Sequence, residues 1–470
     1  MPRRLADPAI RLDRSDPTPL TTQLASELRT AMTTGVLRPS ERLPSSRSLA
    51  AQLGVSRTVV TDAYQQLYAE GWLEGRHGSG TFVAAHEPLA PRTTPVPRNG
   101  PPSPEDHPTR EQVRGKGRVD LRPGAPWVHD HDRAALRRAW RHAAEHVPDS
   151  VPDPRGRPRL RELLAEHLRR ARGIRVGSEN LIVTRGTGNG LDLVAALLGP
   201  GTRAGVEDPG YGRARSILAA RGAHIVPCPV DRDGLRTDEL PDDLGLVYTT
   251  PAHQYPLGGR LPVPRRERLL TWAARTGALV VEDDYDAEFR YDVAPLPALY
   301  GLDQARVVLL GTLSKTLDPD LGIGWIVADP DLVDRLATVR ADLSDRTSGP
   351  VQAATELLLE RGDLDRHLRR MRREYARRRA LLVEHLGAHL TGDTAGLHVL
   401  LPLPEKAVAP VIEAATAEGI LVEDTSRTSH AEPRVHGLVI GYGATPRPDL
   451  RRACEVLALA VRRHTESPGR

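Results

Sequence analysis

Apolar residues recur at helical spacing near the beginning of the chain. Four of them lie four positions apart: Leu20, Leu24, Leu28 and Met32. This spacing predicts a helix with one apolar stripe, and Gly35 is the residue expected to end it.

The residues that follow predict two more helices and a hairpin. Pro44-Ser45 marks the start of the second helix, and Gly54 marks the turn after it. Ser56 is a suitable N-cap for a third helix over 57–70. Two short strands then flank a glycine-rich loop, at 72–74 and 81–83. A small module over 10–84 is therefore predicted.

After residue 119 the pattern changes to alternating strands and helices. Helical stretches, for instance 191–198 and 213–221, separate several apolar runs. Runs buried on both faces with helices between them predict a doubly wound, mainly parallel sheet. An arginine-rich helix over 366–386, with short strands after it, predicts a smaller α+β subdomain. The predicted strands are Leu181–Thr184, His224–Pro227, Leu246–Thr249, Ala278–Glu282, Val307–Leu310 and Ile323–Val327.

A proline-rich segment separates the two modules. Residues 86–118 contain eight prolines and almost no apolar side chains, so they cannot form a packed element. We predict a semi-rigid spacer over 85–118 between the small module and a large module over 119–466.

Composition excludes several classes of protein. The 470 residues include no apolar run long enough to span a membrane. The N-terminus lacks the apolar stretch of a secretory signal, and two cysteines, Cys228 and Cys454, make no disulfide framework. A cytoplasmic location is the simplest expectation. The net charge of +4 does not by itself indicate a polyanionic partner.

Lysine is scarce, which draws attention to each one. Of 65 basic residues only Lys116, Lys315 and Lys406 are lysines. GC-rich coding is our first explanation of the arginine bias. Arginine cannot perform the amine chemistry of lysine, so a lysine at a sheet edge is a candidate for function.

The small module resembles the winged helix-turn-helix of GntR-family regulators nearly from end to end. The resemblance is carried by the segments L-P-x-x-R, L-G-V-S-R, A-Y-x-x-L and H-G-x-G-T between residues 43 and 81. It implies that the third helix enters the major groove of double-stranded DNA and that the hairpin lies beside it. The alternative is a helical protein-interaction module with ordinary solvated side chains.

Positions in this pattern imply individual DNA contacts. Arg47 and Arg57 are expected to contact phosphates or guanine edges, and Thr61 a base. Ser56 and Thr58 are expected to contact phosphates at the helix N-terminus. At the wing tip, the residues expected to approach the minor groove are His77 and Gly78. Tyr64, Leu67 and Trp72 are expected in the core. Residues 1–84 carry 10 arginines and 8 acids, a net of +2, so a dimer is expected to double the phosphate contacts.

Several features of the large module describe a site for an anionic aldehyde cofactor. Lys315 follows the strand Val307–Leu310, and its amine can form a Schiff base. Thr312 and Ser314 can hydrogen-bond a phosphate. Asp283, at another strand end, can pair with a pyridinium nitrogen, and Tyr285 with a phenolic oxygen. A glycine-rich turn offers phosphate-binding backbone amides at Gly186, Thr187 and Gly188.

In this order the motifs resemble fold-type I pyridoxal-phosphate aminotransferases, and the whole chain resembles the MocR-type, GabR-like branch of the GntR family. The fold class implied is a winged helix-turn-helix, mainly α with a β-hairpin wing, followed by an α/β aminotransferase-like domain. That domain is expected to have a mostly parallel sheet and a smaller α+β C-terminal subdomain. The resemblance implies pyridoxal 5′-phosphate bound through Lys315, with Asp283 and Tyr285 in the roles above. It also implies that Tyr211 stacks on the ring, that His253 and Gln254 line the pocket, and that the protein is a head-to-tail homodimer.

The chain departs from this pattern in three places. Gly322 stands where such proteins usually carry an arginine that binds the cofactor phosphate, and Val151 stands where a tyrosine is usual. The segment HGLVIGYG also lacks the arginine that binds a substrate carboxylate, for which Arg434 or Arg213 are the candidate substitutes. Loss of the phosphate contacts is expected to weaken cofactor binding by roughly 100-fold unless other groups compensate.

Three functions follow as hypotheses. The first is a regulator that senses pyridoxal phosphate, or an amine or amino acid that reacts with it, mostly without turnover. The second is an active aminotransferase. The third is a degenerate regulator that no longer binds the cofactor. No metal site is predicted.

Overall fold

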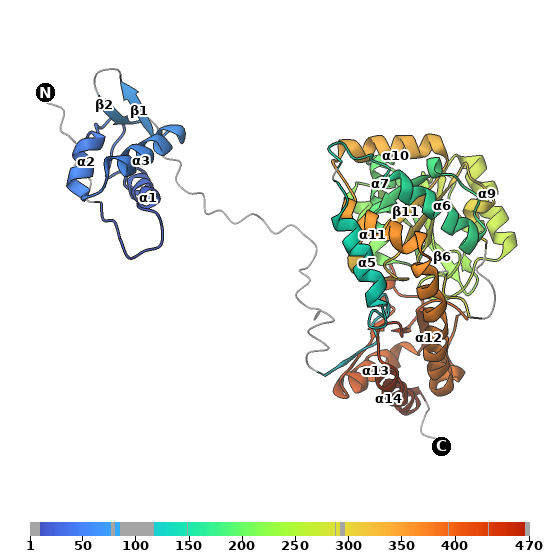
Figure 1. Ribbon diagram of the computed structural model, residues 1–470. Helices are drawn as coiled ribbons and strands as arrows, with labels where there is room; N and C mark the ends of the chain where they lie inside the picture. The colour runs from blue at the N-terminus through green and yellow to red at the C-terminus, as the bar shows by residue number, and fades with distance from the viewer. Residues whose placement is uncertain are drawn as a thin grey trace. The chain divides into compact units, whose positions relative to one another are not determined.

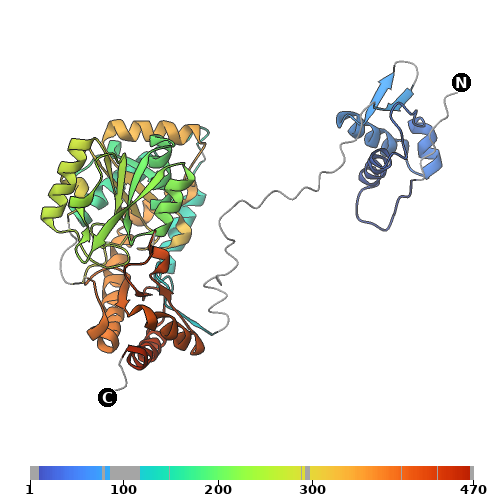
Figure 2. The same cartoon turned by 180° about the vertical axis from the view of Figure 1, so that it is seen from behind.

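The computed structural model describes residues 10–76, 80–84, 117–147, 149–286, 288–291, 297–392, 394–430 and 432–465. The chain divides into two compact units, Met1–Pro104 and Glu105–Arg470, which are coloured from blue to red along the chain in Figures 1 and 2. The proline-rich segment predicted as a spacer lies, up to residue 116, outside the described residues. No helix in the described part of the chain is both long and apolar enough to cross a membrane.

The first unit is a three-helix bundle with a hairpin. Side-chain caps begin the second and third helices, because Ser45 accepts from the Ser48 N–H and Ser56 from the Val59 N–H. Gly54 ends the second helix with φ of 64°. The elements are α1 (Leu20–Thr33), α2 (Ser46–Leu53), α3 (Arg57–Ala69), β1 (Leu73–Arg76) and β2 (Gly80–Val83).

The core of this unit confirms the predicted stripe. Leu24, Leu28 and Met32 are buried, whereas Leu20, the first residue of the helix, is only half-buried. Tyr64 and Leu67 are also buried, as predicted, and the Tyr64 hydroxyl donates to the Pro44 carbonyl at 2.9 Å.

The second unit is built on an eight-stranded sheet with the order β4-β11-β10-β9-β8-β5-β6-β7. All pairings from β10 to β6 are parallel, while β11 and β7 are antiparallel to their neighbours. The sheet is therefore mostly parallel, as predicted. Its strands are β4 (Leu181–Thr184), β5 (Arg203–Asp208), β6 (His224–Asp231), β7 (Gly234–Leu235), β8 (Leu246–Thr249), β9 (Leu279–Asp284), β10 (Val307–Thr312) and β11 (Gly324–Val327).

Helices cover both faces of this sheet (Figure 1). Val308 and Leu310 pack in one apolar cluster with α7 (Thr187–Leu198), α8 (Gly212–Ala220) and α10 (Pro330–Asp342). The alternate residues of the same strand, Val307 and Leu309, pack in the other cluster. That cluster includes residues of α5 (Arg133–Ala144), α6 (Pro158–Arg172), α9 (Val263–Thr276) and α11 (Gly349–Glu360).

A smaller α+β subdomain follows, as predicted. Its antiparallel sheet has the order β12-β15-β14, and a separate strand pair joins β13 to β3 at the start of the second unit. The elements are β3 (Val119–Asp120), α12 (Asp363–Leu386), β12 (His398–Pro402), α13 (Glu405–Ala417), β13 (Ile420–Leu421), β14 (Glu423–Asp424), β15 (Gly437–Gly441) and α14 (Arg447–Thr465).

The six predicted strands are all present, but one central strand was missed. β5 reads Arg-Ala-Gly-Val-Glu-Asp, and its glycine and charged ends interrupt the apolar run. It is a strand because it pairs with β6 and β8 on either side, so tertiary pairing outweighs its weak local pattern.

Candidate functional site

A cavity of about 750 Å³ opens at the carboxyl edge of the large sheet. Residues at or just after the ends of β4, β5, β8, β9 and β10 line it, because these strands point the same way and end at one edge. The small subdomain contributes Leu397, His398 and Glu423 to the wall. The cavity therefore lies where the topology of a doubly wound sheet places ligands.

Lys315 lies in this cavity, three residues after β10. Its Nζ donates a hydrogen bond to the backbone carbonyl of Gly124. Gly124 has φ of 96°, and a Cβ there would lie 3.3 Å from Nζ. The glycine thus lets the backbone approach the amine closely, and the amine is held at the cavity wall.

Asp283 is buried at the end of β9 and faces the same cavity. The Tyr248 hydroxyl donates to its Oδ2 at 2.6 Å, whereas Oδ1 is buried and makes no hydrogen bond within the described residues. Burial raises the pKa of Asp283 to about 6, opposed by hydrogen bonding from the side chains of Tyr248 and Thr187 and by the Lys315 charge. A buried carboxylate oxygen that lacks a partner fits a cationic N–H donor, such as a protonated ring nitrogen.

A glycine turn joins β4 to α7 on another side of the cavity. Gly186 has φ of 119°, and a Cβ on the facing Gly324 would lie 2.6 Å from the Gly186 Cα, so both positions require glycine. The Gly186 N–H is paired with Thr184 Oγ1, which removes one of the three amides predicted to bind phosphate. The N–H groups of Thr187 and Gly188 stand in the first turn of α7, where no intrahelical acceptor exists.

The two predicted hydroxyl groups differ in availability. Thr312 Oγ1 donates to the Ile323 carbonyl at 3.2 Å and accepts from the Ser314 N–H, so it is committed to the loop itself. Ser314 also lines the cavity and is half-buried. Ser314 is therefore the better-placed of the two for an external phosphate.

Tyr285 lines the cavity, but two residues predicted beside it do not. The Tyr285 hydroxyl donates to the His253 carbonyl at 2.9 Å. His253 and Gln254 are not among the residues that line the cavity, because both are used in the wall behind it. The Gln254 amide donates to Glu207 Oε2 and to the Pro209 carbonyl, which holds the loop together.

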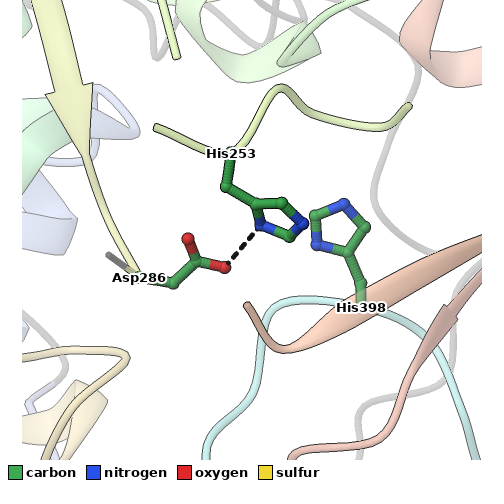
Figure 3. Close-up of side chains that lie close together, drawn as sticks. All are labelled: His253, Asp286 and His398. Atoms are coloured by element: carbon green, nitrogen blue, oxygen red, sulfur yellow. Dashed lines mark hydrogen bonds and ion pairs between the residues drawn. The ribbon is translucent and has the colours of Figure 1, made fainter. Parts of the chain in front are cut away.

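His253 instead belongs to a buried group of three side chains (Figure 3). Its Nδ1 lies 3.0 Å from Asp286 Oδ2, and its ring centroid lies 4.5 Å from that of His398. One ligand-type atom of each of the three residues lies within 4.8 Å of the others. Burial and the neighbouring His253 lower the pKa of His398 well below its usual value, so His398 is neutral. This group supports Tyr285 from behind.

The outer end of the cavity is aromatic and charged. Tyr211 and Tyr255 meet edge to face with ring centroids 6.0 Å apart. Arg213 lines the same end, whereas the other candidate for a carboxylate contact, Arg434, does not line the cavity. The lining residues that the sequence did not single out include Arg185, Asn189, Tyr248, Tyr255 and His398. Lys315 was found because it is a polar residue just past the end of a strand. The same criterion would have found Arg185, just past β4, and Tyr248, near the end of β8.

Gly322 and Val151, two positions that depart from the expected pattern, have free space around them. Gly322 has φ of 55°, and a Cβ added there would meet no atom within 4 Å. Val151 is 82% exposed. Neither residue contributes a charge or a hydroxyl to the cavity.

The first unit presents a second candidate surface. Arg47 on α2 and Arg57 and Thr58 at the start of α3 are exposed. Arg57 Nε donates to Ser46 Oγ at 3.3 Å, while the Thr61 hydroxyl donates to the Arg57 carbonyl. Ser56 is exposed, and its Oγ caps α3. The two wing-tip residues predicted to reach the minor groove, His77 and Gly78, lie outside the described residues.

Both units match known families. Residues 20–83 match the family of bacterial regulatory proteins, gntR family, and residues 128–457 match aminotransferase class I and II. The chain is 36% identical over 465 residues to the HTH-type pyridoxine biosynthesis transcriptional regulator PdxR of Corynebacterium glutamicum, covering 97% of this chain and 99% of the relative.

Other relatives and structures agree. The "Probable rhizopine catabolism regulatory protein MocR" of Rhizobium meliloti is 36% identical over 468 residues, which cover 96% of this chain and 95% of the relative. A crystal structure of an archaeal alanine:glyoxylate aminotransferase superposes with a TM-score of 0.69 at 26% identity, covering 75% of this chain and 93% of that one. The chain therefore belongs to the MocR-type GntR-family transcriptional regulators, in which a GntR helix-turn-helix domain precedes an aminotransferase class I and II domain.

Proposed function

We propose that this regulator binds pyridoxal 5′-phosphate in the sheet-edge cavity and that occupancy of the cavity changes its affinity for DNA. One observation carries the proposal: the amine of Lys315 and the buried carboxylate of Asp283 line one cavity. The relative named for pyridoxine biosynthesis supports the cofactor itself, or an amine that reacts with it, as the signal.

Each residue has a distinct part in this proposal. Bound pyridoxal phosphate supplies an aldehyde that reacts with amines and a ring that withdraws electrons. Lys315 provides the amine and Asp283 keeps the ring nitrogen protonated. The Tyr285 hydroxyl, which donates to the His253 carbonyl in this structure, turns to the ring oxygen when the cofactor is bound. Tyr211 covers the ring face. The first amides of α7, with Ser314, bind the phosphate.

We further propose a cytoplasmic homodimer that binds double-stranded DNA through Arg47, Arg57 and the start of α3. The small charge of the first 84 residues supports a dimer, because two copies double the phosphate contacts. The site supports sensing more than turnover: β15 is buried and has no arginine, so Arg213 is the candidate for an anionic group on the effector.

Arg185 is expected to compensate for the missing arginine at Gly322. It lines the cavity next to Gly186, and its guanidinium lies 2.6 Å from Asp345, a carboxylate that also contacts Arg340 at 3.3 Å. Arg185→Gln should weaken the binding of pyridoxal 5′-phosphate about 10-fold, the effect of one charge-assisted hydrogen bond. Binding is measured by fluorescence titration.

Two comparisons make this test specific. Pyridoxal without its phosphate should bind wild type and Arg185→Gln equally. Arg203→Gln, which removes an exposed arginine paired with Asp243 at 3.0 Å, should leave both ligands unaffected. Equal losses for pyridoxal and its phosphate would rule out a phosphate contact at Arg185.

Cofactor affinity is expected to fall as the pH drops through about 6. Because the pKa of Asp283 is raised to about 6, its proton is bound more tightly in the folded than in the unfolded chain. The stability that this proton provides is therefore lost as the pH rises through about 6, when the empty site must hold a buried carboxylate. A cationic ring nitrogen stabilises that carboxylate, so binding favours the higher pH.

The matched variant is Asp283→Asn. Its affinity for pyridoxal 5′-phosphate should be lower than that of wild type at neutral pH. Between about pH 5 and 7 its affinity should also change less, because only wild type loses the Asp283 carboxylate. Titration of the cofactor phosphate contributes equally to both proteins. Parallel pH profiles for the two proteins would show that Asp283 does not pair with the ring.

The DNA-linked part is tested on the full chain. A duplex is selected from a random pool with the purified protein, and its Kd is measured with and without pyridoxal 5′-phosphate. We expect a change of at least about 5-fold on addition of the cofactor, the range of ordinary allosteric coupling. Arg57→Ala should weaken the selected duplex with or without cofactor, whereas an unchanged Kd with bound cofactor would refute the sensor.

A further inference from the structure

The outward face of α12 carries a row of arginines that the cavity does not use. The opposite face is apolar and buried, with Leu364, Leu368, Met371, Tyr375 and Leu382. At 100° per residue, the exposed arginines fall within about 100° of the helix circumference. They are Arg366, Arg369, Arg370, Arg373 and Arg377.

The row continues onto the neighbouring helix. α12 and α14 pack side by side in the small subdomain (Figure 1). Arg377, Arg447 and Arg451 line one hollow of about 440 Å³ between them. We define the arginine row as the exposed residues Arg369, Arg373, Arg377, Arg447 and Arg451.

Few acids neutralise this row. Glu374 is the carboxylate at its centre, and it already accepts from the buried Arg378 at 2.9 Å. The same carboxylate lies 3.5 Å from Arg447 and 3.8 Å from Arg377. Among the residues that the structure describes, Arg373 and Arg451 form no ion pair, so the row carries an excess of positive charge.

Some exposed arginines elsewhere in this unit are paired with acids. Arg275 pairs with Asp242 at 2.6 Å and Arg203 with Asp243 at 3.0 Å. The arginine row is distinguished by its place, because its members gather on two adjacent helices around one shared carboxylate, Glu374. Burial does not explain the row, because the structural arginine of this helix is Arg378, which lies over the Trp127 ring at 4.1 Å.

We propose that the arginine row binds the phosphate backbone of double-stranded DNA, so that the aminotransferase-like domain is itself a DNA contact. At 1.5 Å per residue, Arg369 to Arg377 span about 12 Å. A duplex carries about seven phosphate charges over that length, which is more than the three guanidinium groups on α12 and the two on α14 would neutralise. The row has no aromatic side chain at its exposed positions, which favours a duplex backbone over single strands, whose bases stack on aromatic rings.

The helix-turn-helix of the same chain supports this partner. Once it holds a duplex, the second unit meets that DNA at a high effective concentration, so modest contacts add to affinity. This proposal rests on the DNA binding of the regulator and not on pyridoxal phosphate, so its test is made without cofactor.

The test is the salt dependence of DNA binding by the full-length protein. The variant Arg373→Gln/Arg377→Gln/Arg451→Gln is compared with wild type on the selected duplex over a range of NaCl concentrations. Each lost phosphate contact lowers the slope of log K against log salt by about 0.9. We expect the slope to fall by about 2 to 3, with at least about 10-fold weaker binding at low salt.

Two controls distinguish the loss of phosphate contacts from a general loss of positive charge and from unfolding. Arg203→Gln/Arg221→Gln/Arg275→Gln removes the same charge from paired arginines of the same unit and should keep the wild-type slope. The triple lysine variant of the row should retain most of the slope, since lysine also neutralises phosphate. A wild-type slope for the glutamine variant of the row, or an equal loss in the paired-arginine control, would overturn the proposal.

Discussion

Lys315→Ala should carry no pyridoxyl group after incubation with pyridoxal 5′-phosphate and reduction with borohydride. Reduction converts a bond between a lysine amine and the aldehyde into a stable secondary amine, which mass spectrometry locates in a peptide. Of the three lysines, Lys406 lies exposed on α13 and Lys116 falls outside the described residues. Among the described lysines, Lys315 lines the cavity, so the label should lie there.

The matched control is Lys406→Ala. It removes an exposed amine of the same chain and should be labelled like wild type. Labelling of Lys315→Ala to the wild-type extent would show that the amine chemistry resides elsewhere. A wild-type protein that takes no label would instead favour the degenerate regulator. Turnover of an amino donor with a keto acid would favour the aminotransferase.

Asp284→Ala should destabilise the second unit strongly. Asp284 lies between Asp283 and Tyr285, and its Oδ2 is 2.8 Å from Nη2 of Arg172. The Arg172 side chain is 1% exposed. Burial disfavours its cation, yet Asp284, Glu288 and Glu282 together raise its pKa. Burial likewise raises the pKa of Asp284, against the pull of Arg172. Removing one partner leaves a buried charge less compensated, at a cost of about 3–5 kcal/mol.

The measurement is denaturant unfolding followed by tryptophan fluorescence, since four of the five tryptophans lie in this unit. Asp242→Ala is the control, because it breaks an exposed pair with Arg275 and should leave the midpoint unchanged. Similar midpoints for Asp284→Ala and wild type would show that Arg172 finds sufficient charge in its other acidic neighbours.

The departures from the family pattern gain a physical meaning in the structure. Gly322 is in the left-handed region, so an arginine there would be strained even though space is available. Arg185 lines the cavity beside Gly186, and it is not among the residues with positive φ, so its backbone is not strained. We therefore expect Arg185, as proposed above, to supply the phosphate contact that is absent at Gly322.

Local sequence was sufficient for elements whose pattern reports their burial. The continuous apolar run of β10 is a direct consequence of a sheet covered on both faces. The four-residue spacing on α1 is a direct consequence of a helix covered on one face. Strand ends also located Lys315, Asp283 and the Gly186 turn, because parallel strands bring their carboxyl ends to one edge.

Only the tertiary structure decided the rest. It placed His253 and Gln254 behind the cavity, since their hydrogen-bond partners lie on Asp286, Glu207 and Pro209, which are distant in sequence. It placed Arg213, and not Arg434, in the wall of the cavity. It also showed that Arg378 is buried, whereas other arginines of the same helix are exposed. Such choices depend on which side chains from different segments meet, and local patterns determine a residue's face but not the partner that faces it.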